Sequence, residues 1–190
     1  MKPFIPGIIV LATPFLLLKG DEPADKKVVT VEVAILVSED GAIDTSIGWA
    51  ELARQAPAMQ GAGKILLDEL VAVSEEKSTA TVKLEFQPAL KVGATKTGGK
   101  TVPSFRFSSA ATSLQVTPEV TQGTIELNLA VEKSWLAATG NEHMPKAIAR
   151  AELESTVSAK PGVTLGFRAN VASDVGKRRD VVVLVTAHAK

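Results

Sequence analysis

The sequence contains no cysteine, no tyrosine and only two histidines in 190 residues. Without cysteine the chain has no disulfides, no thiolate metal sites and no cysteine nucleophile. Basic and acidic residues number 21 each, so the net charge is zero. A chain without net charge has no strong field to attract nucleic acid or an anionic membrane surface. Nucleic acid is therefore not an expected partner.

Residue types that carry catalysis or bind metals are not grouped in any recognised spacing. His143 and His188 lie far apart in the sequence, and neither has a second ligand or a base at motif spacing. The tetrapeptide starting at Gly98, GGKT, superficially resembles the end of a phosphate-binding loop. In that motif, G-x-x-x-x-G-K-[ST], the first glycine would fall on Ala94, so the match fails. We expect no catalytic residues, no metal, no cofactor and no small-molecule substrate, and therefore not an enzyme.

The N-terminal residues resemble an export signal. Lys2 precedes an apolar run, Phe4–Leu18, which is shorter than the ~20 residues that a membrane-spanning helix needs. A basic residue before a run of this length is typical of a secretory signal peptide. We predict a signal peptide or N-terminal anchor over residues 1–19, a polar linker over 20–27 and one β-rich domain over 28–190. The other interpretation is a buried N-terminal strand or helix.

The clearest structural pattern is a β-hairpin over residues 114–132. Its second half alternates strictly, since apolar residues at 125, 127, 129 and 131 are separated by polar or small ones. A period of two places one row against a core and the other towards water or a polar lumen. Gln122 and Gly123 supply the turn, because glycine adopts positive φ without strain. Pro118 cannot donate a ladder hydrogen bond, which restricts it to a strand end, a bulge or an edge.

The remaining pattern predicts an α+β domain dominated by antiparallel strands. Further strands are expected over 28–37, 81–86, 152–158, 163–167 and 181–185, with a loop or hairpin tip over 91–101 and an irregular segment over 133–146. The main helix is predicted over Lys64–Ser74, where residues 67, 70, 71 and 74 form one stripe. Residues 50–55 are a second, short helical candidate, and residues 56–63 read as a loop.

Four segments, taken in their order, resemble one family. Residues 31–37 with Ile47-Gly48-Trp49, residues 84–92 around Pro88, the hairpin over 114–132, and the strand pair over 150–167 with 180–186 are similar to the C-terminal domain of bacterial secretins. Secretins are outer-membrane proteins of type II and type III secretion systems. The residues that carry the resemblance are Ile47, Gly48, Trp49, Pro88, Val116, Thr117, Pro118, Gly123, Gly162, Gly166 and Thr186.

The resemblance implies a homo-oligomer in which strands pair between copies to form a multi-subunit barrel. It also implies association with the membrane and with other secretion or envelope proteins, in the periplasm or outer membrane. The chain departs from the family pattern at Phe167 and Ala187, and in the short connection over 168–179. Aromatic residues are only 4% of the chain, too few for the girdles of a membrane-spanning surface. A second hypothesis is a soluble extracytoplasmic binding or structural module that kept this fold without forming a pore.

Overall fold

The computed structural model describes residues 26–39, 43–107, 109–137, 147–172 and 178–190. Within these ranges the chain forms ten strands, one 3-10 helix and one α-helix. In chain order they are β1 (Val28–Glu39), η1 (Thr45–Ile47), α1 (Trp49–Gly61), β2 (Ile65–Glu75), β3 (Ala80–Phe86), β4 (Ala89–Thr97), β5 (Lys100–Phe107), β6 (Ala110–Thr121), β7 (Thr124–Ala137), β8 (Ala147–Ala159), β9 (Thr164–Ala172) and β10 (Arg178–Ala189). This composition confirms the predicted α+β class dominated by antiparallel sheet.

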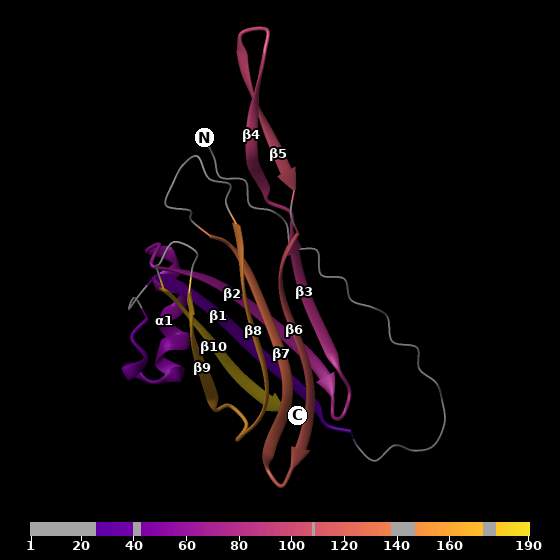
Figure 1. The fold of residues 1–190 in the computed structure, drawn as a ribbon. Coiled ribbons are helices and arrows are strands. Elements are labelled where there is room, and N and C mark those ends of the chain that lie inside the picture. Colours follow the sequence, from indigo (N-terminus) through magenta and orange to yellow (C-terminus); the bar gives the residue numbers. More distant parts are fainter. Residues whose placement is uncertain (1–25, 40–42, 108, 138–146, 173–177) are drawn as a thin grey trace, which may run out of the picture.

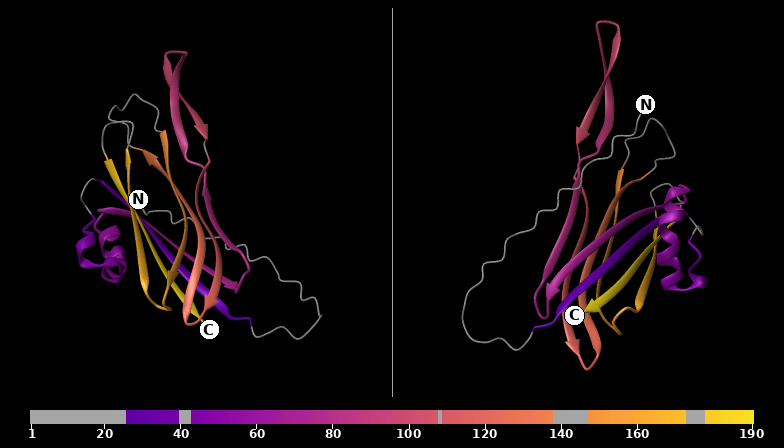
Figure 2. Two further views of the ribbon diagram at one scale, coloured as in Figure 1. Left: turned by 60° about the horizontal axis from the view of Figure 1, so that its bottom comes forward. Right: turned by 180° about the vertical axis from the view of Figure 1, so that it is seen from behind.

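Two four-stranded sheets pack face to face (Figure 1). Sheet A has the strand order β2-β1-β10-β9, and sheet B has the order β3-β6-β7-β8. Every neighbouring pair in both sheets is antiparallel. The β4–β5 pair forms a separate two-stranded ribbon that projects beyond the sandwich, as Figures 1 and 2 show. We call this ribbon the arm.

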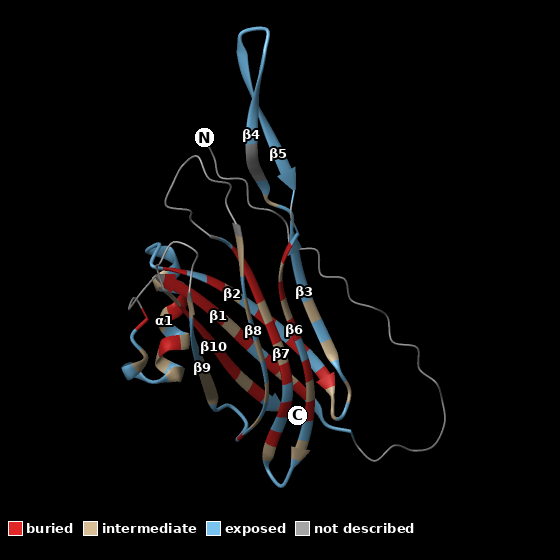
Figure 3. Cartoon of the chain, viewed as in Figure 1, coloured by how far each residue is buried: buried red, intermediate tan, exposed pale blue. Residues whose placement is uncertain are grey.

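The main core lies between the two sheets, where Figure 3 shows the buried residues concentrated. It is made from the inward rows predicted by the period of two. Sheet B contributes the row Ile125, Leu127, Leu129 and Val131 from β7, which is at most 4% exposed. Sheet A contributes alternate residues of β1 and β10. Burial of large aliphatic side chains at about 25 cal/mol per Å² is the main stabilising term for such a sandwich.

A second, smaller core covers part of the outer face of sheet A. Leu52 and Ala56 of α1 pack there against Leu36, Val182 and Leu184. These strand segments are thus buried on both faces, which explains their unbroken apolar sequences. The strands predicted over 28–37 and 181–185 are confirmed as parts of β1 and β10, and residues 181–185 are at most 5% exposed.

The predicted hairpin over 114–132 is confirmed as β6 and β7. Gln122 and Gly123 form its two-residue turn with φ of 46° and 84°, the positive values that a right-twisted hairpin favours. Pro118 lies within β6, beyond the end of its pairing with β3. The carbonyl of Pro118 accepts a hydrogen bond from the Lys77 N–H at 2.7 Å. The proline nitrogen therefore faces the β3 side rather than β7, and no β6–β7 ladder bond is lost.

The prediction of the main helix over Lys64–Ser74 is wrong, because this segment is strand β2. All of its residues from Ile65 to Glu75 pair with β1. The apolar spacing that resembled a helical stripe is the sum of two strand rows. Leu70 and Ala72 face sheet B, while Ile65 and Leu67 face α1. Two half-filled rows on opposite faces can imitate the i, i+3, i+4 pattern.

The helix instead spans Trp49–Gly61, so the short candidate over 50–55 is confirmed and the loop over 56–63 is largely wrong. The helix contains Pro57, which lies on the solvent-exposed side of the helix. The expected irregular segment over 133–146 is also partly wrong, since β7 continues to Ala137. Residues 138–146 and the predicted N-terminal signal and linker up to residue 25 lie outside the described residues. No helix in the described ranges is long and apolar enough to cross a membrane.

Candidate interaction surfaces

The structure brings together two segments that carry the secretin resemblance. Gly48 joins η1 to α1 with φ of 86°, a conformation that favours glycine, and its carbonyl accepts from the Leu52 N–H at 3.0 Å. Trp49 then starts α1 and lies against Gly166 of β9. The Trp49 ring therefore covers the backbone of β9 at Gly166. Ile47, the third residue of this element, is 37% exposed.

The other resemblance residues lie in three separate places. Gly162 forms the β8–β9 turn with φ of 79°, and its N–H donates to the Ala187 carbonyl at 2.8 Å. Close to that turn, the hydroxyl of Thr186 bonds that of Thr164 at 2.8 Å. Val116, Thr117, Pro118 and Gly123 belong to the β6–β7 hairpin, and Pro88 separates β3 from β4. These residues shape turns and junctions, and the described residues do not form one site from them.

Each sheet has two open edges. Within the described ranges, β2 and β9 of sheet A and β3 and β8 of sheet B each pair with one strand. An open edge presents unpaired N–H and C=O groups that can accept a further strand. In both sheets the outer strands run antiparallel to each other, because four strands alternate in direction. The two open edges of each sheet are therefore suited to antiparallel pairing with each other in neighbouring copies.

The face of sheet B turned away from the core is polar and rich in glutamate. Arg150 contacts two of these carboxylates, Glu132 at 3.1 Å and Glu152 at 2.5 Å. On β3, Lys83 forms an ion pair with Glu85. The hydrogen bond that Lys83 donates to Glu85 raises the pKa of Lys83, and the charges of Glu85 and Glu132 act in the same direction. Lys83 pairs with Ser113, which pairs with Glu132, so these groups lie in one row on the same face.

The arm is exposed along β5 and along residues 93–97 of β4. All eight residues of β5 are exposed, including Val102, Phe105 and Phe107 at 53%, 54% and 67% (Figure 3). Its tip is the Gly98-Gly99 turn, which confirms the predicted hairpin tip over 91–101 and places no helix after GGKT. A two-stranded hairpin alone is marginally stable in water. Exposed aromatic side chains on such a ribbon are typical of a surface that contacts a partner.

A cleft lies between β2 and β3, which diverge from the turn that joins them (Figure 1). Its floor holds a polar cluster in which Asp68 of β2 accepts from Lys133 Nζ and, at 2.5 Å, from Thr112 Oγ1. The Lys133 side chain is 8% exposed and that of Asp68 is 25% exposed. Trp135 lies beside this cluster, and its buried indole N–H has no hydrogen-bond partner among the described residues. The cluster links the two sheets where the apolar core ends.

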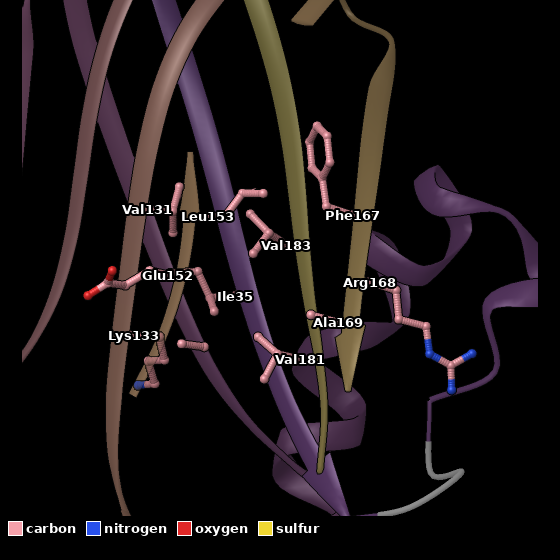
Figure 4. Close-up of a pocket in the computed structure, with 11 residues that line it drawn as sticks. Ile35, Val131, Lys133, Glu152, Leu153, Phe167, Arg168, Ala169, Val181 and Val183 are labelled. Atoms are coloured by element: carbon pink, nitrogen blue, oxygen red, sulfur yellow. The ribbon is translucent and has the colours of Figure 1, made fainter. Parts of the chain in front are cut away.

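A smaller pocket lies between the sheets on the opposite side, near β8 and β9. Ile35, Val181 and Val183 of sheet A face Val131 and Leu153 of sheet B across it (Figure 4). The charged ends of Glu152 and Arg168 point outward, away from these apolar side chains. Polar groups that could orient a ligand do not point into the pocket, so we interpret it as a packing void.

Among the described residues, no group of three or more histidine, aspartate or glutamate side chains could hold a metal ion. His188 lies exposed on β10, and His143 lies outside the described residues. The described residues instead present open strand edges, a polar face and an exposed arm.

Comparison with known proteins decides the family. The family model named Secretin, bacterial type II and III secretion system protein, matches residues 58–167. The chain belongs to the secretin family. The matched region runs from within α1 to β9, so it contains all of sheet B and the arm. No curated protein matches the sequence.

Several solved secretins are similar in structure. The InvG secretin domain of the Salmonella SPI-1 injectisome is 12% identical, with a TM-score of 0.49, and the match covers 88% of this chain and 64% of that chain. The competence pilus secretin PilQ of V. cholerae is 14% identical with a TM-score of 0.39, covering 87% and 60%. PulD of the Klebsiella pneumoniae type II secretion system is 10% identical with a TM-score of 0.47, covering 86% and 40%. This secretin chain thus spans less than two thirds of each of them.

Sequence reasoning missed the polar cluster of this secretin. Asp68 was placed on a helix and Lys133 in an irregular segment, so the two could not be connected. One signal was available, because the alternation of β7 continues through Val131, Lys133 and Trp135. Extending the period of two would have placed Lys133 on the inward row and raised the question of its partner.

Proposed function

We propose that this protein is a subunit of a multi-copy envelope assembly of the type II or III secretion or pilus type, built by strand pairing between copies. The observation that carries the proposal is the pair of open, mutually antiparallel edges in each sheet. Membership of the secretin family supports it. The role is structural and transport-related rather than catalytic. Its place is the cell envelope, periplasm or outer membrane, with other secretion proteins as partners.

The arm supports the same proposal. A ribbon that makes few contacts with its own sandwich, and that exposes Phe105 and Phe107, gains stability by pairing with a second ribbon. In an assembly the arms of neighbouring copies would lie at the same height and supply that partner. The apolar segment at residues 4–18 would serve as export signal or anchor, as its composition suggests.

A second candidate is a soluble extracytoplasmic module that does not form a pore. The observation that favours it is the short connection between β9 and β10. The pairing of these strands begins at Ala172 and Arg178, so only five residues connect them. The scarcity of aromatic residues favours it too. Under this candidate the strand edges would bind another envelope protein.

The experiment that tests the proposal is the size of the protein extracted from cell envelopes in mild detergent, measured by light scattering on a sizing column. A large particle of many copies, roughly ten or more in a closed symmetric ring, is the expected result. A monomer or dimer released without detergent would overturn the proposal and leave the soluble module.

A further inference from the structure

The outer strands of sheet B carry opposite charges in matching positions. On β3, Lys83 is followed two residues later by Glu85. On β8, Arg150 is followed two residues later by Glu152, with Glu154 next on the same face. All five side chains are on exposed residues of the polar face. The two edges therefore each end in a row of alternating charge.

The strand register shows how these rows relate. Lys83 pairs with Ser113, which pairs with Glu132, which pairs with Glu152. Two residues further along, Glu85 pairs with Ala111 and Arg150 pairs with Ser134; extending the β6–β7 register by one pair past Thr112↔Lys133 places these two charges in one row. β3 and β8 run antiparallel. Along the direction of β3, the β3 edge therefore presents a positive charge and then a negative one, while the β8 edge presents a negative charge and then a positive one. The β3 edge of sheet B is thus complementary in charge to its β8 edge.

The backbone at these positions is free to pair. The Pro118 carbonyl and the Val120 N–H both face the β3 side, since they bond Lys77 at 2.7 Å and the Glu76 carboxylate at 3.3 Å. Alternation along β6 then turns the backbone groups of Ser113 towards β7. In the same row, the N–H and C=O groups of Lys83 and Glu152 point to the open edges. An added copy would meet matching donors and acceptors there.

We propose that the β3 edge of one copy pairs with the β8 edge of the next, with Lys83 held against Glu152 and Glu154. We call this contact the seam. The inference rests on the proposed assembly and names the residues that set its register. Cross-strand pairs of opposite charge stabilise a sheet and like charges directly opposite destabilise it. Charged edges often prevent association, but a protective edge would repel its counterpart, whereas these two attract.

Two registers of the seam place Lys83 opposite a glutamate. In the register continuous with the rows of one copy, Lys83 faces Glu152 and Glu85 faces Arg150, so both contacts are attractive. A shift of two residues places Lys83 opposite Glu154 but Glu85 opposite Glu152, so one contact is attractive and the other is repulsive. A sheet that closes on itself needs a stagger, and the second glutamate lets the seam supply it without losing the lysine contact. A shift the other way places Lys83 opposite Arg150, which is repulsive.

Introduced cysteines test the seam directly, because the native chain contains none. The variants combine Lys83→Cys with Glu152→Cys, Glu154→Cys or, as a control, Ser158→Cys. Within one copy the two positions lie three strand spacings apart, roughly 14 Å, so only neighbouring copies can be bridged. We expect a ladder of disulfide-linked chains, on a non-reducing gel of the extracted assembly, from one of the first two pairs and not from the control.

Charge reversal provides the second test. Lys83→Glu should reduce the assembled fraction on the sizing column several-fold, and adding Glu152→Lys and Glu154→Lys should restore it. Lys27→Glu, a change on an exposed lysine before β1, is the matched control and should leave assembly unchanged.

The outcomes separate this inference from the proposed function. If the native protein assembles but neither test cysteine pair forms a ladder and Lys83→Glu assembles normally, the seam is wrong and the proposed function stands. If the native protein is a monomer in envelope extracts, both are wrong.

Discussion

The indole of Trp49 occupies the space that a side chain at position 166 would need. An ideal Cβ on Gly166 would lie 2.1 Å from Trp49 Cδ2, closer than real atoms approach. Since α1 is otherwise held by a small core around Leu52 and Ala56, this contact determines how the helix sits on sheet A.

Replacing Gly166 with alanine should therefore destabilise the protein by about 1–3 kcal/mol, the usual cost of overpacking. The measurement is urea unfolding. In a Trp49→Ala background the same change should cost much less, because the clash is removed. Gly93→Ala is the control, since a Cβ there meets nothing within 4 Å. Equal losses in both backgrounds would show that the ring does not restrict position 166.

The polar cluster predicts an asymmetric response to mutation. Asp68→Ala leaves the Lys133 ammonium buried without its carboxylate and should cost about 2–4 kcal/mol, since breaking a buried ion pair leaves an uncompensated charge. Lys133→Met should cost less, because Asp68 is the more exposed partner and can be solvated. The double variant Asp68→Ala, Lys133→Met should be more stable than Asp68→Ala alone. Chemical unfolding of the three variants checks the order, and additive losses would contradict it.

The β6–β7 turn can be improved. Gln122 has φ of 46°, a conformation that asparagine tolerates better than glutamine. Gln122→Asn should stabilise the protein by roughly 0.5 kcal/mol, while Gly123→Ala should destabilise it by roughly 1 kcal/mol. Thermal unfolding measures both. A neutral Gly123→Ala would mean that the turn relaxes to another type.

The first turn of α1 contains a carboxylate with a depressed pKa. Hydrogen bonds from Arg54 and Gln55 lower the pKa of Glu51 from 4.5 to about 2. A carboxyl that binds protons less readily in the folded state stabilises the fold above its unfolded pKa, and this contribution is lost as the pH falls from 4.5 towards 2. The melting temperature of Glu51→Gln should thus fall less over this range than that of the native protein. The difference should be small, because the pair is exposed to solvent.

The arm predicts a protease-sensitive site. Trypsin should cleave after Lys96 or Lys100 in the unassembled chain well before it cleaves after the buried Lys133, because cleavage requires local opening of exposed backbone. In the extracted assembly the same bonds should be protected if arms pair between copies. Mass spectrometry of early fragments identifies the bonds, and equal cleavage in both states would show that the arm has no partner.

Local sequence patterns predicted most strands correctly. The segments that they did not predict take their structure from contacts with residues distant in the sequence. The alternation in β7 and the turn at Gly123 depend on neighbours in sequence, so they could be predicted. The segment after Lys64 could not, because its two apolar rows meet different layers, α1 and sheet B. Pro57 and the flanking glycines made α1 look shorter than it is, although a solvent-facing proline is tolerated there.

The candidate surfaces depended even more on distant pairing. The charges at Lys83 and Glu152 are ordinary solvated residues when considered along the chain. Their relation requires the register across four strands, which joins residues about seventy positions apart and leaves no trace in local spacing.

The strand order of sheet A affects the order in which its strands can pair during folding. Strand β1 lies between β2 and β10, and the N–H of Lys190 donates to the Val28 carbonyl at 2.9 Å. The β4–β5, β6–β7 and β7–β8 pairs join strands that are consecutive in the sequence, and such local pairs form early. One side of β1 stays unpaired until β10, the last strand in the described ranges, arrives. A chain that emerges from a membrane channel N-terminus first would keep this apolar strand open throughout passage, and would require either a holding partner or rapid completion to avoid aggregation.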